Sequence, residues 1–133
     1  NRMKVALGIG CDRNTPAATI RQAIAKALAS AGASLQDVQA VASIDLKSDE
    51  AGLCEVVQQH RWSIRYYAAA ELATIAVPNP SETVRKHTGT PSVAEAAALL
   101  AAGGEDAQLI VEKHKLRGAD GRNASVSIAR MRL

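Results

Sequence analysis

Residues 7–16 read LGIGCDRNTP, and this stretch decides the fold. It completes an apolar run that predicts a buried strand, and it then turns through Gly8 and Gly10 toward a helix. We expect Thr15 to cap that helix and Pro16 to occupy its first position. The glycines have two readings: they let the strand and a helix pack closely, or they belong to a binding site, which the polar residues beside them favour.

A helix that begins directly after a strand exposes free backbone N–H groups and the positive end of its dipole. Such a point suits an anionic group. The first loop, defined here as residues 10–15, therefore predicts an anion site. Its candidate ligand-binding residues, together with the glycine shortly before it, are Gly8, Gly10, Cys11, Asp12, Asn14 and Thr15.

Apolar runs alternate with helical patterns along the rest of the chain, which is typical of an α/β domain. Strands are expected at 4–9, 40–44, 65–68, 108–112 and 125–131, the last two as a C-terminal antiparallel hairpin. Helices are expected at 15–31, 48–60, 69–76, 81–89 and 92–103. We predict a single domain over residues 1–133, built as a three-layer sandwich with a mainly parallel sheet and helices on both faces.

The composition limits the classes of function. A net charge of +3 over 133 residues and 2% aromatic residues argue against a nucleic-acid partner. Neither the two cysteines nor the three histidines have metal-ligand or redox spacing, so no metal and no cofactor are predicted. With no signal peptide and no apolar run long enough to span a bilayer, we expect a cytoplasmic protein without a membrane partner.

The common nucleotide-binding motifs are also missing. A dinucleotide fingerprint needs a third glycine where Arg13 stands, and it needs an acidic residue nearer to the glycines than Asp45. No GKS or GKT sequence of the Walker type occurs. Ordinary nucleoside triphosphate chemistry is therefore not supported.

Ligands of open α/β sheets bind beyond the carboxyl ends of the strands. The second loop, defined as residues 45–50, and the basic segment 113–117 each follow a predicted strand, while the turn at 89–92 opens a helix. The candidate ligand-binding residues of these parts of the chain are Ser43, Asp45, Lys47, Gly89, Ser92, Lys113 and Lys115.

Three residues are candidates for catalysis. Asp45 and Glu50 could act as a base. Cys11 could act as a nucleophile, because a helix N-terminus lowers the pKa of a thiol. A cysteine nucleophile also needs an orienting base, however, and the sequence ties no histidine to Cys11. The alternatives remain open that Cys11 is a small residue in a tight turn and that the second loop is simply solvated.

Four separated parts of the chain resemble the cobalamin-biosynthesis family of CobE and the C-terminal domain of CbiG. They are GIGC at 8–11, ASIDLKSDEAGL at 42–53, GTPSVAEAAAL at 89–99, and LIVEK at 109–113 with ASVSIAR at 124–130. The resemblance spans essentially the whole chain, in the family's order. One departure is Ala94, where relatives often carry Cys.

The resemblance implies a role in building the corrin ring, and hence a precorrin-type tetrapyrrole, rich in acetate and propionate carboxylates, as the ligand. Other enzymes of the corrin pathway are further candidate partners. In CbiG-like proteins the associated activity opens a ring lactone of a cobalt-precorrin with loss of acetaldehyde, which makes a lactone hydrolase the alternative function. The chain's length resembles the stand-alone CobE form, because we expect no segment before the first strand that could be the N-terminal part of CbiG. For the CobE form the family offers no equally firm reaction.

Overall fold

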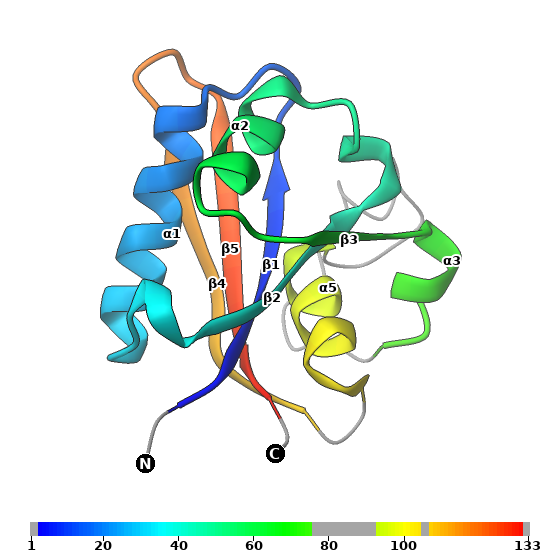
Figure 1. Cartoon of the computed structure of the whole chain (residues 1–133). Coiled ribbons are helices and arrows are strands. Elements are labelled where there is room, and N and C mark those ends of the chain that lie inside the picture. Colours follow the sequence, from blue (N-terminus) through cyan, green and yellow to red (C-terminus); the bar gives the residue numbers. More distant parts are fainter. Residues whose placement is uncertain (1–2, 76–92, 105–106, 132–133) are drawn as a thin grey trace.

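The computed structural model of the chain describes residues 3–75, 93–104 and 107–131 (Figure 1). The strands are β1 (Val5–Cys11), β2 (Val38–Ile44), β3 (Ile64–Tyr67), β4 (Gln108–Arg117) and β5 (Asn123–Arg130). The helices are α1 (Ala17–Ala31), α2 (Ala51–Gln59), α3 (Ala69–Leu72) and α5 (Val93–Ala102), with 3-10 turns at Leu35–Asp37 and Asp45–Lys47. The predicted helix at 81–89, and with it Gly89 and Ser92, lies outside the described residues.

The strands form one sheet in the order β3–β2–β1–β5–β4. β1 pairs with β2, and β2 with β3, in parallel, whereas β5 pairs antiparallel with both β1 and β4. The predicted α/β fold and C-terminal antiparallel hairpin are confirmed, but the sheet is mixed, because two of its four described strand pairs are antiparallel. β5 runs opposite to the other four strands, whose C-terminal ends therefore meet at one edge, called the carboxyl edge below.

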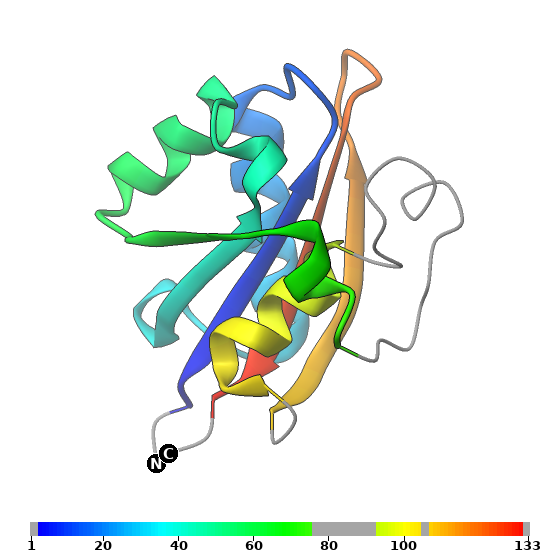
Figure 2. The same cartoon turned by 90° about the vertical axis from the view of Figure 1, so that its right-hand side faces the viewer.

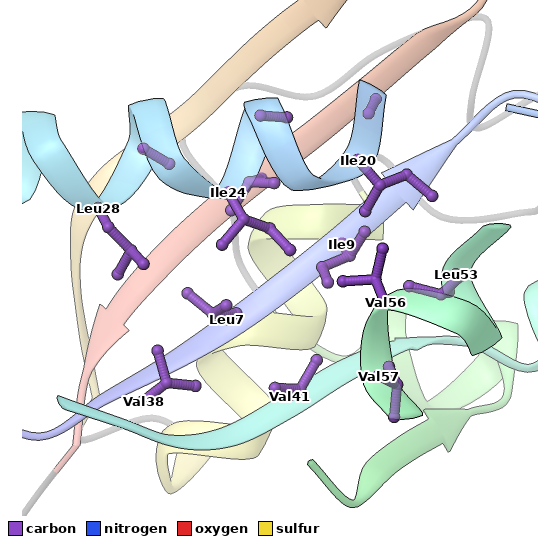
Figure 3. Close-up of a cluster of buried hydrophobic side chains, with 14 of the residues drawn as sticks. Leu7, Ile9, Ile20, Ile24, Leu28, Val38, Val41, Leu53, Val56 and Val57 are labelled. Atoms are coloured by element: carbon purple, nitrogen blue, oxygen red, sulfur yellow. The ribbon is translucent and has the colours of Figure 1, made fainter. Parts of the chain in front are cut away.

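Helices α1 and α2 cover one face of the sheet (Figures 1 and 2). The buried residues Ile20, Ile24 and Leu28 recur at helical spacing along α1, and they belong to the same core cluster as Leu7 and Ile9 of β1 (Figure 3). Gly32, with a left-handed φ of 67°, ends α1. The periodicity in the sequence therefore predicted both this helix and its buried side.

Helices α5 and α3 pack on the opposite face (Figure 2). Most buried residues of α5 are alanines, so its backbone approaches the sheet closely. A Cβ added at Gly8 would overlap the carbonyl oxygen of Ala94 and lie 2.6 Å from the nitrogen of Ala98. Among the described residues, nothing comes within 4 Å of a Cβ added at Gly10. The two readings of the glycines thus separate: Gly8 serves helix packing, whereas no described residue packs against the position of a side chain at Gly10.

The basic segment 113–117 lies within β4, not in the loop that the sequence predicts. Leu116 pairs with Ala124 and packs against the core beside α1, so pairing with β5 extends the strand as far as Arg117. Register shifts between Leu109 and His114 interrupt the regular alternation. Because the alternation of exposed and buried residues is broken there, the period of two typical of a strand does not run continuously from residue 108 to residue 117, and the sequence pattern does not predict a strand over the basic segment.

The described residues contain no helix that is both long and apolar enough to cross a membrane.

Candidate functional site

The first loop is fixed to the start of β5 through Asp12 and Thr15. The Asp12 carboxylate accepts hydrogen bonds from the backbone and side-chain N–H groups of Asn123, at 2.8 and 3.0 Å. The buried Thr15 hydroxyl donates to the carbonyl oxygens of Asp12 and Asn123, at 2.8 and 3.2 Å. The predictions that Thr15 caps α1 and that Pro16 occupies its first position are both wrong, because Pro16 is the N-cap and α1 begins at Ala17. The Thr15 hydroxyl is used within the loop.

Arg13 and Asn14 join the first loop to the second. Nη1 of Arg13 donates to the carboxylates of Asp49 and Glu50, both at 2.7 Å, and Nη2 donates to the carbonyl oxygen of Leu46 at 3.1 Å. The backbone N–H of Asn14, a residue with a φ of 65°, donates to the other oxygen of Glu50 at 3.0 Å. The second loop is thereby held against the first at several points.

Electrostatics and burial separate the two carboxylates of this network. The hydrogen bond from Arg13 holds the pKa of Asp49 below its ordinary value, although the Asp49 side chain is 71% exposed. The Glu50 side chain is only 3% exposed, and both of its oxygens accept hydrogen bonds from the first loop. Asp45, by contrast, is exposed at the start of the second loop. Of the two predicted bases, Asp45 is therefore the one that a bound molecule could reach.

Cys11 lies on the face of the sheet that α1 and α2 cover, partly buried against their core cluster. Burial raises the pKa of its thiol to about 11, although the positive charge of Lys47 opposes this shift. The expected lowering of the pKa by a helix N-terminus is therefore wrong, and the thiol is protonated near pH 7. Nucleophilic catalysis by Cys11 loses its physical basis.

Ser43 is fully buried near the end of β2. Its hydroxyl donates to the carbonyl oxygen of Ile9 at 2.6 Å, so it ties β2 to β1. Tyr66 of β3 contacts Cys54 on the same side, and burial there raises the pKa of its phenol to about 12. The buried Ser43 and the partly buried Tyr66 and Cys54 support the carboxyl edge from the α2 side.

A different set of residues lines the opposite face at the carboxyl edge. Gly10 pairs with Ser125 of β5, and Ser125 pairs with Lys115 of β4, so the three side-chain positions form one row across the sheet. Strand alternation places this row on the face of Gly8, ahead of the first turn of α5. Ser125 is partly exposed and Lys115 is exposed. We call Gly10, Ser125 and Lys115 the polar shelf.

The structure thus divides the predicted site residues between the two faces. Cys11 and Ser43 lie on the α2 side, whereas Gly10 and Lys115 lie on the α5 side. Sequence reasoning missed Ser125, although the alternation of small polar and apolar residues in ASVSIA placed it on the face opposite Val126. Lys47 of the second loop is partly buried, and Lys113 is exposed on β4.

Within residues 3–75, 93–104 and 107–131, no group of three or more His, Cys, Asp or Glu side chains could hold a metal ion. The described side chains at this edge carry hydroxyl, amide, ammonium and carboxylate groups. Such groups can bind an anion and can exchange protons with it.

Comparisons with known proteins agree with the fold and with the resemblance drawn from the sequence. The chain is similar to Protein CobE of Sinorhizobium sp, with 41% identity over 111 residues that cover 82% of this chain and 71% of that protein. It is also similar to a Cobalt-precorrin-5A hydrolase of Priestia megaterium, with 42% identity over 109 residues. That match covers 82% of this chain but only 29% of the hydrolase.

Among solved structures, the chain is similar to a crystal structure of CobE, a protein of the cobalamin (vitamin B12) biosynthetic pathway. The TM-score is 0.85 at 36% identity, over 98% of this chain and 92% of that one. The family model described as Cobalamin synthesis G C-terminus matches residues 5–129. The chain therefore belongs to the cobalamin-biosynthesis family of the CbiG C-terminal domain and CobE.

Proposed function

We propose that this protein binds a precorrin-type tetrapyrrole intermediate of cobalamin biosynthesis at the carboxyl edge of its sheet, on the α5 side. The observation that carries the proposal is the polar shelf, a stretch of sheet around Gly10 that no described residue covers and that continues in register to a hydroxyl and an ammonium group. The choice of a precorrin as the ligand is supported by the similarity of this chain to CobE, a protein of the cobalamin biosynthetic pathway.

The chemistry of the shelf suits such a ligand. A precorrin is a broad ring with several carboxylate side chains. Its ring needs a flat surface without protruding side chains, which the bare backbone at Gly10 offers. Its carboxylates form charge-assisted hydrogen bonds with donors such as Ser125 and Lys115. Asp45 and Lys47 of the second loop, together with Lys113 of β4, supply further polar groups toward the same edge of the sheet.

The binding proposal is tested by titrating the protein with hydrogenobyrinic acid while its absorption spectrum is followed. We expect a saturable change at micromolar ligand. The absence of any spectral or calorimetric response in that range would remove the proposal. We further propose that the protein works in the cytoplasm, where it passes its ligand to other enzymes of the pathway.

Replacing the shelf lysine should weaken binding in a salt-dependent manner. We expect Lys115→Ala, and to a smaller extent Lys113→Ala, to lower the affinity for hydrogenobyrinic acid about three- to fivefold at low ionic strength, because an exposed ion pair contributes little more. At about 0.5 M salt the loss should shrink below about twofold. Calorimetric titration at both ionic strengths measures it.

Lys26→Ala is the matched control, because it removes the same charge from α1 on the other face of the sheet. Its affinity should equal that of the wild type at both salt concentrations. Equal losses for Lys115→Ala at low and high salt would mean that the lysine contributes packing instead of charge.

The second candidate function is hydrolysis of the precorrin's ring lactone, which the similarity to a Cobalt-precorrin-5A hydrolase favours. Lactone opening needs a base and donors for the oxyanion of the tetrahedral intermediate. Asp45 is exposed and could activate water, and Lys47 could stabilise the developing charge. The discriminating assay measures acetaldehyde release from a lactone-bearing precorrin. Release that disappears in Asp45→Asn would establish the enzyme, whereas binding without release leaves a carrier.

A further inference from the structure

We propose that Glu50 is the positioning residue of the carboxyl edge, holding the second loop, and with it Lys47, over Cys11 through its contacts with Arg13 and Asn14. The part of this inference that concerns ligand binding rests on the proposed function. The part that concerns the loops themselves does not depend on any ligand.

The two carboxylate oxygens of Glu50 bind two neighbouring residues of the first loop, Arg13 and Asn14. One carboxylate oxygen binds Arg13, whose other nitrogen donates to the carbonyl oxygen of Leu46, the residue just before Lys47. The second oxygen accepts the N–H of Asn14, which has a left-handed backbone at φ 65°. Asparagine adopts that conformation more readily than other residues with a side chain, and the hydrogen bond to Glu50 holds it in place here. Glu50 therefore fixes a point on each loop at once.

Burial distinguishes Glu50 from the other carboxylate on the same guanidinium. Arg13 contacts Asp49 and Glu50 at the same distance of 2.7 Å, but the Asp49 side chain is 71% exposed and that of Glu50 is 3% exposed. An exposed ion pair contributes little to stability. Loss of charge from a buried, doubly hydrogen-bonded carboxylate leaves its partners without an acceptor of equal strength. The network therefore depends on Glu50 much more than on Asp49.

The reactivity of the Cys11 thiol is sensitive to how the two loops are placed. Its thiol is partly buried, and its pKa responds to the charges of Lys47, Glu50, Asp12 and Arg13, so both loops lie close to it. If Glu50 holds the loops together, breaking its contacts should admit water to Cys11 and bring the pKa of the thiol down toward its ordinary value. Because the charge of Glu50 also raises this pKa, a variant that keeps the carboxylate, Arg13→Lys, is needed to isolate the movement of the loops. The reaction of Cys11 with a disulfide reagent then measures the closure of the loops directly.

The experiment uses a Cys54→Ser background, which leaves Cys11 as the single thiol. Ellman's reagent is added near pH 8, and the rate is compared for the parent, Glu50→Gln and Asp49→Asn. Each substitution removes one carboxylate charge at nearly constant shape. We expect Glu50→Gln to react at least about tenfold faster than the parent, because far more of the thiol is ionised and accessible. Asp49→Asn should stay within about twofold of the parent.

The pH profile separates positioning from a general loss of stability. In the parent the rate should keep rising toward pH 11, following the thiol pKa of about 11. In Glu50→Gln the rate should level off at a lower pH, while thermal unfolding stays cooperative and well above the assay temperature. Equal rates and equal pH profiles for Glu50→Gln and Asp49→Asn would overturn the proposal. Arg13→Lys keeps both carboxylates and the positive charge, and it must also react faster than the parent, since one ammonium group cannot replace the three guanidinium contacts. A rate equal to that of the parent would overturn the proposal, whether or not Glu50→Gln folds.

A double-mutant cycle with hydrogenobyrinic acid tests the consequence for binding. If Glu50 acts through Lys47, the double variant Glu50→Gln/Lys47→Ala should lose no more affinity for the ligand than Lys47→Ala alone. The cycle of Glu50→Gln with Lys115→Ala, on the other face, should be additive. Additive losses of affinity in both cycles would contradict the proposal that Glu50 positions Lys47 for ligand binding. A wild type that does not bind this ligand contradicts the proposed function, and the thiol reaction still decides the role of Glu50.

Discussion

Gly8→Ala is expected to destabilise the protein by at least about 3 kcal/mol, or to prevent folding. The added methyl group would overlap the carbonyl oxygen of Ala94 and lie 2.6 Å from the nitrogen of Ala98, and both atoms belong to the backbone of α5. A backbone cannot rotate away as a side chain can, so α5 must shift and open the core cluster on its face of the sheet. Urea unfolding followed by circular dichroism measures the loss.

Gly10→Ala is the matched control for this substitution. It makes the same change two residues along the same strand, on the same face, where none of the described atoms lies within 4 Å of the new Cβ. We expect its free energy of unfolding to stay within about 1 kcal/mol of the wild type. If Gly8→Ala were as stable as Gly10→Ala, the close packing of α5 on β1 would be contradicted.

Gly52→Ala should give the second large effect, a net loss of roughly 2 kcal/mol. Alanine gains about 1 kcal/mol of helix propensity over glycine within α2, which taken alone would stabilise the protein. The added Cβ would, however, overlap the carbonyl oxygen of Thr15 and lie 3.0 Å from the nitrogen of Ala17. Because this overlap falls on backbone, α2 must move away from the start of α1, and unfolding in urea measures the cost.

Gly118→Ala is the comparison for that prediction. Its Cβ would lie 2.5 Å from Oγ1 of Thr19, which is a side-chain atom. Cγ2 of Thr19 would lie 3.1 Å and the carbonyl oxygen of Arg122 3.3 Å from the same Cβ, but the tightest contact falls on a side chain, which can shift more easily than backbone. We expect a loss below about 1 kcal/mol. A more stable Gly52→Ala protein would show that helix propensity outweighs the contact between α2 and the first loop.

The features that were predictable from the sequence are those that local pattern determines. The alternation of apolar runs with helical spacing indicated the α/β class, and Ile20, Ile24 and Leu28 indicated the buried side of α1. Gly32 marked the end of that helix. Each of these depends on residues within a few positions of one another, which a reading along the chain can compare.

The errors arise where distant parts of the chain decide the outcome. Arg13 and Glu50 are 37 residues apart, and the Thr15 hydroxyl binds a carbonyl group 108 residues away, so their roles are visible only in the fold. The strand at 113–117 exists because β5 pairs with it across a register shift. The pKa of the Cys11 thiol is likewise raised by burial, and this burial depends on the loops that surround the residue in the fold.

The division of the site between two faces was partly available in the sequence. Leu7 and Ile9 alternate with Gly8 and Gly10, so Cys11 belongs to the face of the leucine and the isoleucine. The period of two along this one strand is therefore enough to separate Gly10 from Cys11. What it could not supply is the register that brings Ser125 and Lys115 beside Gly10.

The most direct test of ligand binding on the polar shelf is a calorimetric titration of the wild type and of Gly10→Val with hydrogenobyrinic acid. Valine would fill the open space on the shelf while remaining a good strand residue. We expect micromolar binding by the wild type and an affinity at least about tenfold lower in Gly10→Val, a loss of about 1.4 kcal/mol, with cooperative unfolding retained. Equal affinities for the two proteins, or no heat of binding to the wild type, would contradict it.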